Sequence, residues 1–211
     1  MKNAMEEEFR FCGREYSQDN DYSIRISVRD NIKKILPIEF TMNGRTMEDK
    51  ATESEISQLR SVNGSLGWIA RHGRPEYLYH YSTLQSYVSI AQVKHLAEAN
   101  RVLAELQANP DTSIYFPAKA FSWRDAVVVT ITDASWANDS RIVESGVYKR
   151  RSQYGRITLL APPTIWDPEV KDVQVHFIGW KSGLIRRVCF DECADRHSEQ
   201  KQWVLLMVLN L

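Results

Sequence analysis

The feature that most constrains this chain is a β-branched run, residues 127–132 (VVVTIT), which leads directly into Asp133. β-branched residues favour a pleated strand, so the run predicts a strand inside a sheet. Asn138, Asp139 and Ser140 follow closely and are typical turn residues, which predicts that the strand ends near Asp133. A carboxylate at the end of a buried strand costs free energy unless it has a partner. Two interpretations are open on these residues alone: Asp133 binds a divalent metal ion, or it caps the exit of the strand into a turn.

Composition and charge restrict the class of protein. The chain has 211 residues and a hydrophobic fraction of 43%, which allows one large globular domain or two small ones. Its formal net charge of zero argues against a strongly basic nucleic-acid-binding protein but is compatible with a local basic groove. Cys12, Cys189 and Cys193 have neither disulfide-framework nor zinc-site spacing. We find no apolar run near the ~20 residues of a membrane span and no signal-peptide core, so we expect an intracellular protein, cytoplasmic or nuclear, without a membrane partner.

The first half of the chain is predicted to be mainly helical after an opening β-hairpin. The hairpin strands are residues 9–13 and 22–28, separated by turn residues. Thr52 and Glu55 have the spacing of a capping box, which predicts a helix that continues to Arg74-Pro75. Gly64 and Gly67 either weaken this helix or allow another backbone to approach closely. Further helices are predicted at residues 28–36, 81–89 and 93–109.

The second half is predicted to be mainly β-structure. Strands are expected at residues 113–116, 126–132, 154–161 and 173–180, and a long helix at residues 187–211. This order predicts an antiparallel meander covered by a terminal helix, with a domain boundary within residues 109–118. The predicted fold class is therefore α+β.

Several short motifs, taken in order, resemble copia-type retrotransposon Pol polyproteins. GSLGWIA at residues 64–70, followed by Arg74-Pro75, is similar to one segment of that family, and TDASWA at residues 132–137 is similar to its first ribonuclease H motif. Further short matches follow the family's order: Phe11-Cys12-Gly13, Leu84-Gln85-Ser86, and residues 97–103, 151–155 and 179–182. Together the motifs extend over most of the chain, from about Phe9 to Arg187.

The resemblance implies a fragment of Pol. Residues 1–50 would be the end of the reverse-transcriptase palm and the start of its thumb, residues 51–112 the helical thumb and connection, and residues 113–211 a partial ribonuclease H-like domain. That domain is expected to be incomplete, with a three-stranded antiparallel meander plus a C-terminal helix. The family carries out RNA-directed DNA synthesis and magnesium-dependent hydrolysis of RNA in RNA–DNA hybrids. Its polymerase aspartates would lie upstream of Met1, so we expect no DNA synthesis by this chain alone.

Hydrolysis in this family requires a pair of Mg²⁺ ions held by about three or four carboxylates. Asp133 matches the family's first acid, and it is the predicted catalytic residue and metal ligand. Arg196 falls where the second acid, a glutamate, belongs, and a cation there repels magnesium. Glu192 shares the predicted helix face of Arg196 and is the substitute candidate. The third acid would lie on a strand beyond Leu211. The sequence therefore predicts that hydrolysis is lost or nearly lost, and whether the chain is an enzyme is open.

Basic and aromatic side chains suggest contacts with nucleic acid. The residues expected to contact phosphates are Arg150, Arg151, Lys181 and Arg187, and those expected to stack on bases are Trp123, Trp136 and Trp180. The partner implied by the family is an RNA–DNA hybrid or duplex. Two alternatives without catalysis are open: a nucleic-acid-binding module that uses these residues, and a protein-interaction module. The latter would bury the apolar tail, residues 203–211, by self-association or against another subunit.

Overall fold

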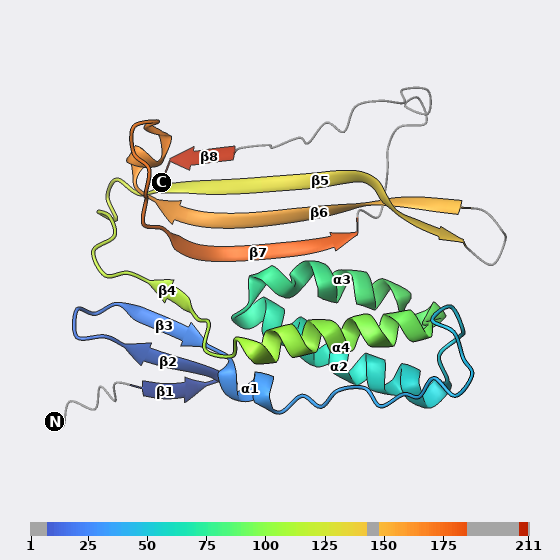
Figure 1. Ribbon diagram of the computed structural model, residues 1–211. Helices are drawn as coiled ribbons and strands as arrows, with labels where there is room; N and C mark the ends of the chain where they lie inside the picture. Colours follow the sequence, from blue (N-terminus) through green and yellow to red (C-terminus); the bar gives the residue numbers. More distant parts are fainter. Residues whose placement is uncertain (1–7, 143–147, 185–206, 211) are drawn as a thin grey trace, which may run out of the picture. The chain divides into compact units, whose positions relative to one another are not determined.

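The computed structural model describes residues 8–142, 148–184 and 207–210, and for residues 135–142, 148–152 and 207–210 it describes the backbone alone. The chain forms two compact units, Met1–Ala118 and Lys119–Leu211, and each contains a sheet (Figure 1). All α-helices of the described part belong to the first unit. The architecture is α+β, as the sequence predicts. Within the described ranges, no helix is both long and apolar enough to cross a membrane.

The sheet of the first unit has four antiparallel strands in the order β1-β2-β3-β4. The strands are β1 (Glu8–Phe11), β2 (Arg14–Gln18), β3 (Ile24–Ser27) and β4 (Ile114–Phe116). The prediction of a single hairpin missed β2, because its sequence, REYSQ, has no alternation of apolar residues. The predicted strand at residues 113–116 is present, but it pairs with β3 in the first unit instead of opening the second half of the chain.

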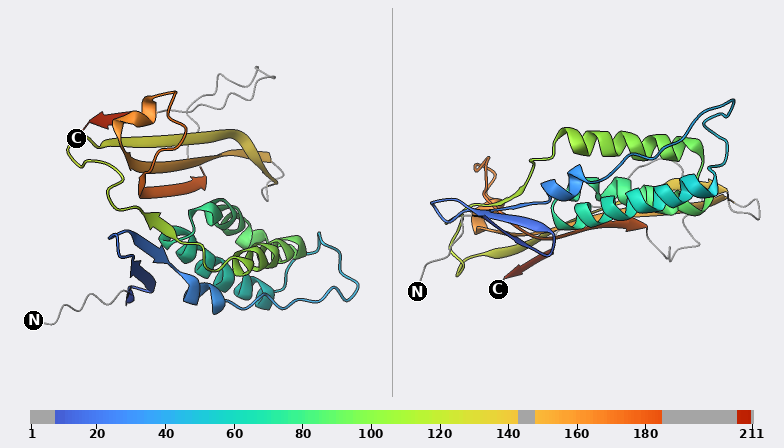
Figure 2. Two further views of the ribbon diagram at one scale, coloured as in Figure 1. Left: turned by 60° about the vertical axis from the view of Figure 1, so that its left-hand side comes forward. Right: turned by 90° about the horizontal axis from the view of Figure 1, so that it is seen from below.

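The helices of the first unit pack as a bundle. They are α1 (Arg29–Lys33), α2 (Glu53–His72), α3 (Leu78–Tyr87) and α4 (Val93–Ala108), with short 3-10 turns η1 (Pro75–Tyr77) and η2 (Val88–Ile90) on either side of α3. α2, α3 and α4 contact one another pairwise, and Figure 2 shows them side by side. The largest side chains with no exposed surface come from α1, α2 and α4: Ile32, Leu59, Leu96 and Leu106. The apolar periodicity of the sequence therefore marks the buried faces correctly.

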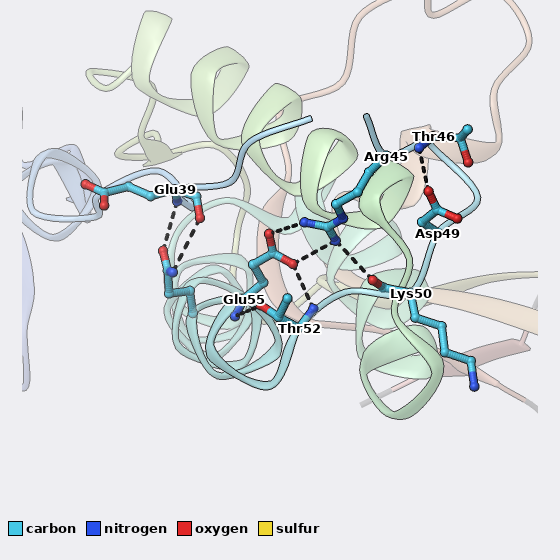
Figure 3. Close-up of polar contacts among 8 residues, drawn as sticks. Glu39, Arg45, Thr46, Asp49, Lys50, Thr52 and Glu55 are labelled. Carbon is cyan, nitrogen blue, oxygen red and sulfur yellow. Dashed lines mark hydrogen bonds and ion pairs between the residues drawn. The ribbon is translucent and has the colours of Figure 1, made fainter. Parts of the chain in front are cut away.

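The start of α2 is fixed by the predicted capping box and by an added ion pair (Figure 3). The backbone N–H of Glu55 donates to Thr52 Oγ1 at 3.3 Å, and the N–H of Thr52 donates to Glu55 Oε2 at 2.8 Å. Arg45 donates to both oxygens of Glu55, at 2.7 and 3.0 Å, and to the carbonyl of Lys50 at 3.0 Å. The Arg45 hydrogen bond is the largest cause that lowers the pKa of Glu55 from 4.5 to about 2; burial opposes it and the bonds from Thr52 reinforce it.

Residues of the GSLGWIA…RP segment have packing roles in this bundle. A Cβ atom at Gly67 would lie 2.3 Å from Cε2 of Tyr81, so the glycine makes room for that ring. The sequence allows another backbone to approach Gly67 closely, whereas in the structure it is the Tyr81 side chain that approaches it. Arg74 is only 3% exposed; its Nη1 donates to the carbonyl of Asn109 at 2.6 Å and its Nε to Glu76 at 2.5 Å. Arg74 therefore joins the end of α2 to the end of α4.

The second unit is an antiparallel sheet in the order β7-β6-β5-β8. Its strands are β5 (Val127–Ile142), β6 (Tyr148–Ala161), β7 (His176–Leu184) and β8 (Met207–Asn210), and the 3-10 turn η3 (Pro163–Trp166) lies between β6 and β7. The predicted three-stranded meander is present as β5, β6 and β7. A small core forms where Val127, Val129 and Ala161 pack with Ile165 and Val175.

Two predictions for this unit are wrong. β5 does not end near Asp133 but continues to Ile142, because the pairing of Asp139 and Ser140 with β6 overrides the local turn preference of this stretch. A register shift between Ser135 and Asp139 accommodates the irregular stretch.

The predicted helix at residues 187–211 is wrong over Met207–Asn210, which pair with β5 as β8. An apolar run of this length suits a strand as well as a helix, and a pairing partner decides between them. The remainder of the predicted helix, residues 187–206, lies outside the described residues.

Candidate functional site

Asp133 lies in the middle of β5, opposite Gly155 of β6, and its side chain is exposed. Water solvates an exposed carboxylate, so Asp133 needs neither a metal ion nor another partner to offset a cost of burial. Nor does it cap the exit of a strand, since β5 continues to Ile142. Both interpretations of Asp133 offered by the local sequence assumed a buried strand end, and that assumption is wrong.

The register of the sheet separates the residues of the second unit between two faces. Residues paired across antiparallel strands share a face, and successive residues along a strand alternate between faces. Asp133 therefore shares a face with Ile131, Ile157 and Ser182, which we call the Asp133 face. Ile131 and Ile157 are 40% and 39% exposed. The Asp133 face is thus mainly apolar around its acid.

The opposite face carries the described basic side chains of this sheet. We call it the Lys181 face, and it includes four cross-strand rows: Val128–Leu160–His176, Thr130–Thr158–Gly179, Thr132–Arg156–Lys181 and Ala134–Tyr154–Gly183. The exposed Ile178 is unpaired at the register shift between the first two rows. Lys181 and Arg156 are cross-strand neighbours and both are exposed. Lys181 Nζ lies 5.9 Å from the centroid of the Tyr154 ring. Within the part of the chain whose side chains are described, neither cation forms an ion pair.

Arg156 was not among the basic residues singled out from the sequence. The period-two alternation of residues 154–161 indicates which β6 residues share a face with Arg156. The pairing of Arg156 with Lys181 of β7 depends on the register between β6 and β7 and on the register shift at Thr158/Leu159. Neither can be predicted from the sequence of one strand alone.

The other predicted site residues are less well placed or lie outside the described residues. Arg150 and Arg151 belong to β6, in the stretch where the backbone alone is described, and Trp136 lies in the corresponding stretch of β5. Arg187, Glu192 and Arg196 fall within residues 185–206 and are not described. Trp123 is 68% exposed, whereas Trp180 is half-buried and pairs with Ile157 of the Asp133 face.

The described residues do not fit the magnesium pair that the resemblance implies. Among residues 8–134 and 153–184, whose side chains are described, no three His, Cys, Asp or Glu side chains gather closely enough to hold a metal ion. The cross-strand neighbour of Asp133 on β6 is Gly155, which has no side chain. The next residue in the row, Ser182 of β7, has a neutral hydroxyl. One exposed carboxylate cannot neutralise two divalent ions.

No family model, curated protein or solved structure matches this chain. The resemblance to copia-type Pol polyproteins therefore rests on the sequence motifs alone.

Proposed function

We propose that this chain is a remnant of a copia-type reverse transcriptase/ribonuclease H in which hydrolysis of RNA–DNA hybrids has been lost. The observation that carries the proposal is the environment of Asp133. The residue that matches the family's first nuclease acid lies exposed on β5, beside a glycine and two isoleucines. Within the part of the chain whose side chains the structure describes, the surroundings of Asp133 carry too little negative charge to concentrate Mg²⁺ next to a phosphodiester.

The order of elements along the chain supports the ancestry. A small sheet and a helical bundle precede the antiparallel meander, in the order expected of a palm end, a thumb with its connection, and the start of a ribonuclease H domain. The motif residues Gly67 and Arg74 are retained where they serve packing of the bundle. Selection on stability alone is enough to keep such residues after catalysis has gone.

The proposal is tested by incubating the purified chain with an end-labelled RNA–DNA hybrid in Mg²⁺, beside an active ribonuclease H as positive control. We expect cleavage at background for the natural chain and for Asp133→Asn alike. Magnesium-dependent cleavage that disappears in Asp133→Asn would overturn the proposal, because it would require the acid cluster that we infer to be incomplete.

A second candidate function is nucleic-acid binding without catalysis. It is favoured by the adjacent, exposed side chains of Arg156 and Lys181, which lie on the face opposite Asp133. Arg150, Arg151 and Arg187 are proposed from the sequence as further phosphate contacts, without assignment to a face. Binding through phosphates weakens with salt, so affinity for a hybrid or duplex should fall linearly on a logarithmic salt scale. An affinity that neither salt nor Lys181→Gln changes would count against this function.

Self-association through the apolar tail is also a proposal. The sequence predicts self-association on the expectation that residues 203–211 are helical. In the structure Met207–Asn210 of this tail form the strand β8, which pairs with β5. Light scattering over a range of concentrations tests it, because a constant monomer mass would exclude association.

A further inference from the structure

We infer that the Lys181 face of the second unit binds single-stranded nucleic acid, independently of Asp133. The inference rests on the second candidate function, binding without catalysis, and specifies its ligand. It combines three features of one sheet face: an exposed aromatic cluster at one end, an open floor in the middle and two cations at the other end.

The aromatic cluster lies where β7 begins. The ring of His176, which pairs with Leu160 on the Lys181 face, lies 4.8 Å from the ring of Phe121 and 5.7 Å from that of Trp123, centroid to centroid. Phe121 and Trp123 contact each other edge to face at 5.6 Å. Because Trp123 is 68% exposed, its ring offers surface to a ligand without any change in the cluster. An exposed indole stacks on an unpaired base, whereas bases within a duplex are already stacked.

The middle of the face is open. The row Thr130–Thr158–Gly179 consists of short side chains, and the two threonine hydroxyls lie 3.3 Å apart. A Cβ atom added at Gly179 would meet nothing within 4 Å. The row therefore leaves space between the aromatic cluster and the cations, and its hydroxyls can bond to sugar or base atoms.

The cationic end supplies charge for phosphates. Arg156 and Lys181 are exposed, and the rows of the described Lys181 face contain no acidic residue to neutralise them. Tyr154, whose ring lies beside Lys181, adds a second aromatic surface. From His176 to Lys181, β7 is about 16 Å long at about 3.3 Å per residue. This length equals that of roughly four or five stacked bases. A short single strand can thus stack at one end and pair its phosphates with cations at the other.

Binding on this face leaves Asp133 apart from the ligand. Asp133 and its neighbours Ile131 and Ile157 lie on the other side of the same sheet. A nucleic-acid strand bound along β7 on the Lys181 face therefore does not bring its phosphates near the Asp133 carboxylate. The affinity for nucleic acid should not depend on Asp133.

The test is fluorescence anisotropy of the full chain with labelled single-stranded DNA and RNA decamers, with the matching duplex and hybrid as competitors. We expect single strands to bind more tightly than either double-stranded form. Trp123→Ala should weaken binding about tenfold through loss of stacking. The double variant Arg156→Gln/Lys181→Gln should lower the salt slope by about 1.4, roughly 0.7 for each phosphate contact. Lys171→Gln and Asp133→Asn are matched controls that should leave affinity unchanged.

A pair of glycines provides a control for the face itself. Gly179 and Gly155 lie on opposite faces, and an added Cβ at either would meet nothing within 4 Å. Gly179→Leu should obstruct the open row and weaken single-strand binding, whereas Gly155→Leu should not. Circular dichroism of each variant confirms that the sheet is retained.

Three results would overturn the inference: no measurable single-strand binding by the natural chain, equal effects of Gly179→Leu and Gly155→Leu, or competition by an acidic peptide as effective as that by the unlabelled single strand. Duplex binding that needs Lys181 but not Trp123 would also overturn it while leaving the second candidate function intact. Hydrolysis of a hybrid would contradict the loss of catalysis and would not bear on this face.

Discussion

Arg45, in the loop before α2, and Glu55, in the first turn of that helix, form a bidentate ion pair with N–O distances of 2.7 and 3.0 Å. The same loop also meets α4, because the N–H of Val93 donates to the carbonyl of Asp49 at 3.0 Å. Glu55 is 6% exposed, so its charge depends on these partners and not on water. The loop therefore links the starts of α2 and α4, and the ion pair is its attachment to α2.

The pH dependence of stability should reveal this pair. The pKa of Glu55 is lowered from 4.5 to about 2 in the folded chain, chiefly by Arg45. The carboxylate consequently stabilises the fold above about pH 4.5, and that contribution is lost as the pH falls towards 2. Glu55→Gln should lower the thermal midpoint at pH 7, and the gap from the natural chain should narrow in acid. Glu53→Gln, on an exposed neighbour, is the control; a gap for Glu55→Gln that stays constant with pH would contradict the assignment.

The capping hydroxyl of Thr52 should have a measurable effect of its own. Thr52→Ala removes the acceptor of the Glu55 N–H and should reduce the free energy of unfolding by about 1 kcal/mol. Urea denaturation measures the loss, with Ser54→Ala inside the first turn as the comparison. Equal effects of the two alanine substitutions would show that the cap contributes nothing specific.

The two glycines of α2 should respond in opposite directions to alanine. Gly67→Ala places a Cβ 2.3 Å from the Tyr81 ring, which Arg71 holds by a 2.8 Å hydrogen bond, and should cost about 1–3 kcal/mol. Gly64→Ala meets nothing within 4 Å and should stabilise the helix by about 0.5–1 kcal/mol. Chemical denaturation of both variants measures the difference, and a stabilising Gly67→Ala would show that the Tyr81 ring moves aside freely.

The buried guanidinium of Arg74 should be difficult to replace. Two different guanidinium nitrogens make its hydrogen bonds, Nε to Glu76 and Nη1 to the carbonyl of Asn109. The single ammonium group of a lysine does not reproduce this arrangement of donors. Arg74→Met should cost about 2–3 kcal/mol through lost charge-assisted hydrogen bonds, and Arg74→Lys should recover only part of this loss. Full recovery by lysine in thermal denaturation would mean that charge alone, and not the directions of the bonds, is required.

The helical unit was largely predictable from the sequence because its signals are local. Thr52 and Glu55 mark the start of α2, and Arg74-Pro75 follows its end closely, so both limits depend on nearby residues. The face of α4 that carries Leu96, Val102 and Leu106 is buried, as its spacing indicates. β2 was missed since its polar sequence becomes a strand only by lying between β1 and β3.

The sheet of the second unit and its candidate site were less predictable because they depend on pairing between distant segments. Residues 138–140 have turn propensity, yet they lie within β5, where Asp139 and Ser140 pair with β6. The separation of Asp133 and Lys181 onto opposite faces follows from the registers of β5, β6 and β7, which no single segment encodes. The motif around Asp133 could therefore suggest an acid but not its exposure or its neighbours.

Whether Asp133 can hold a divalent ion is decided by titrating Mn²⁺ into the ¹⁵N-labelled chain and following paramagnetic broadening of amide signals. We expect the signals of Asp133 and Gly155 to broaden no more than those around Asp125, an exposed acid outside the strands. Selective, saturable broadening centred on Asp133, abolished by Asp133→Asn, would contradict the proposal that this acid lacks the partners needed for metal-dependent hydrolysis.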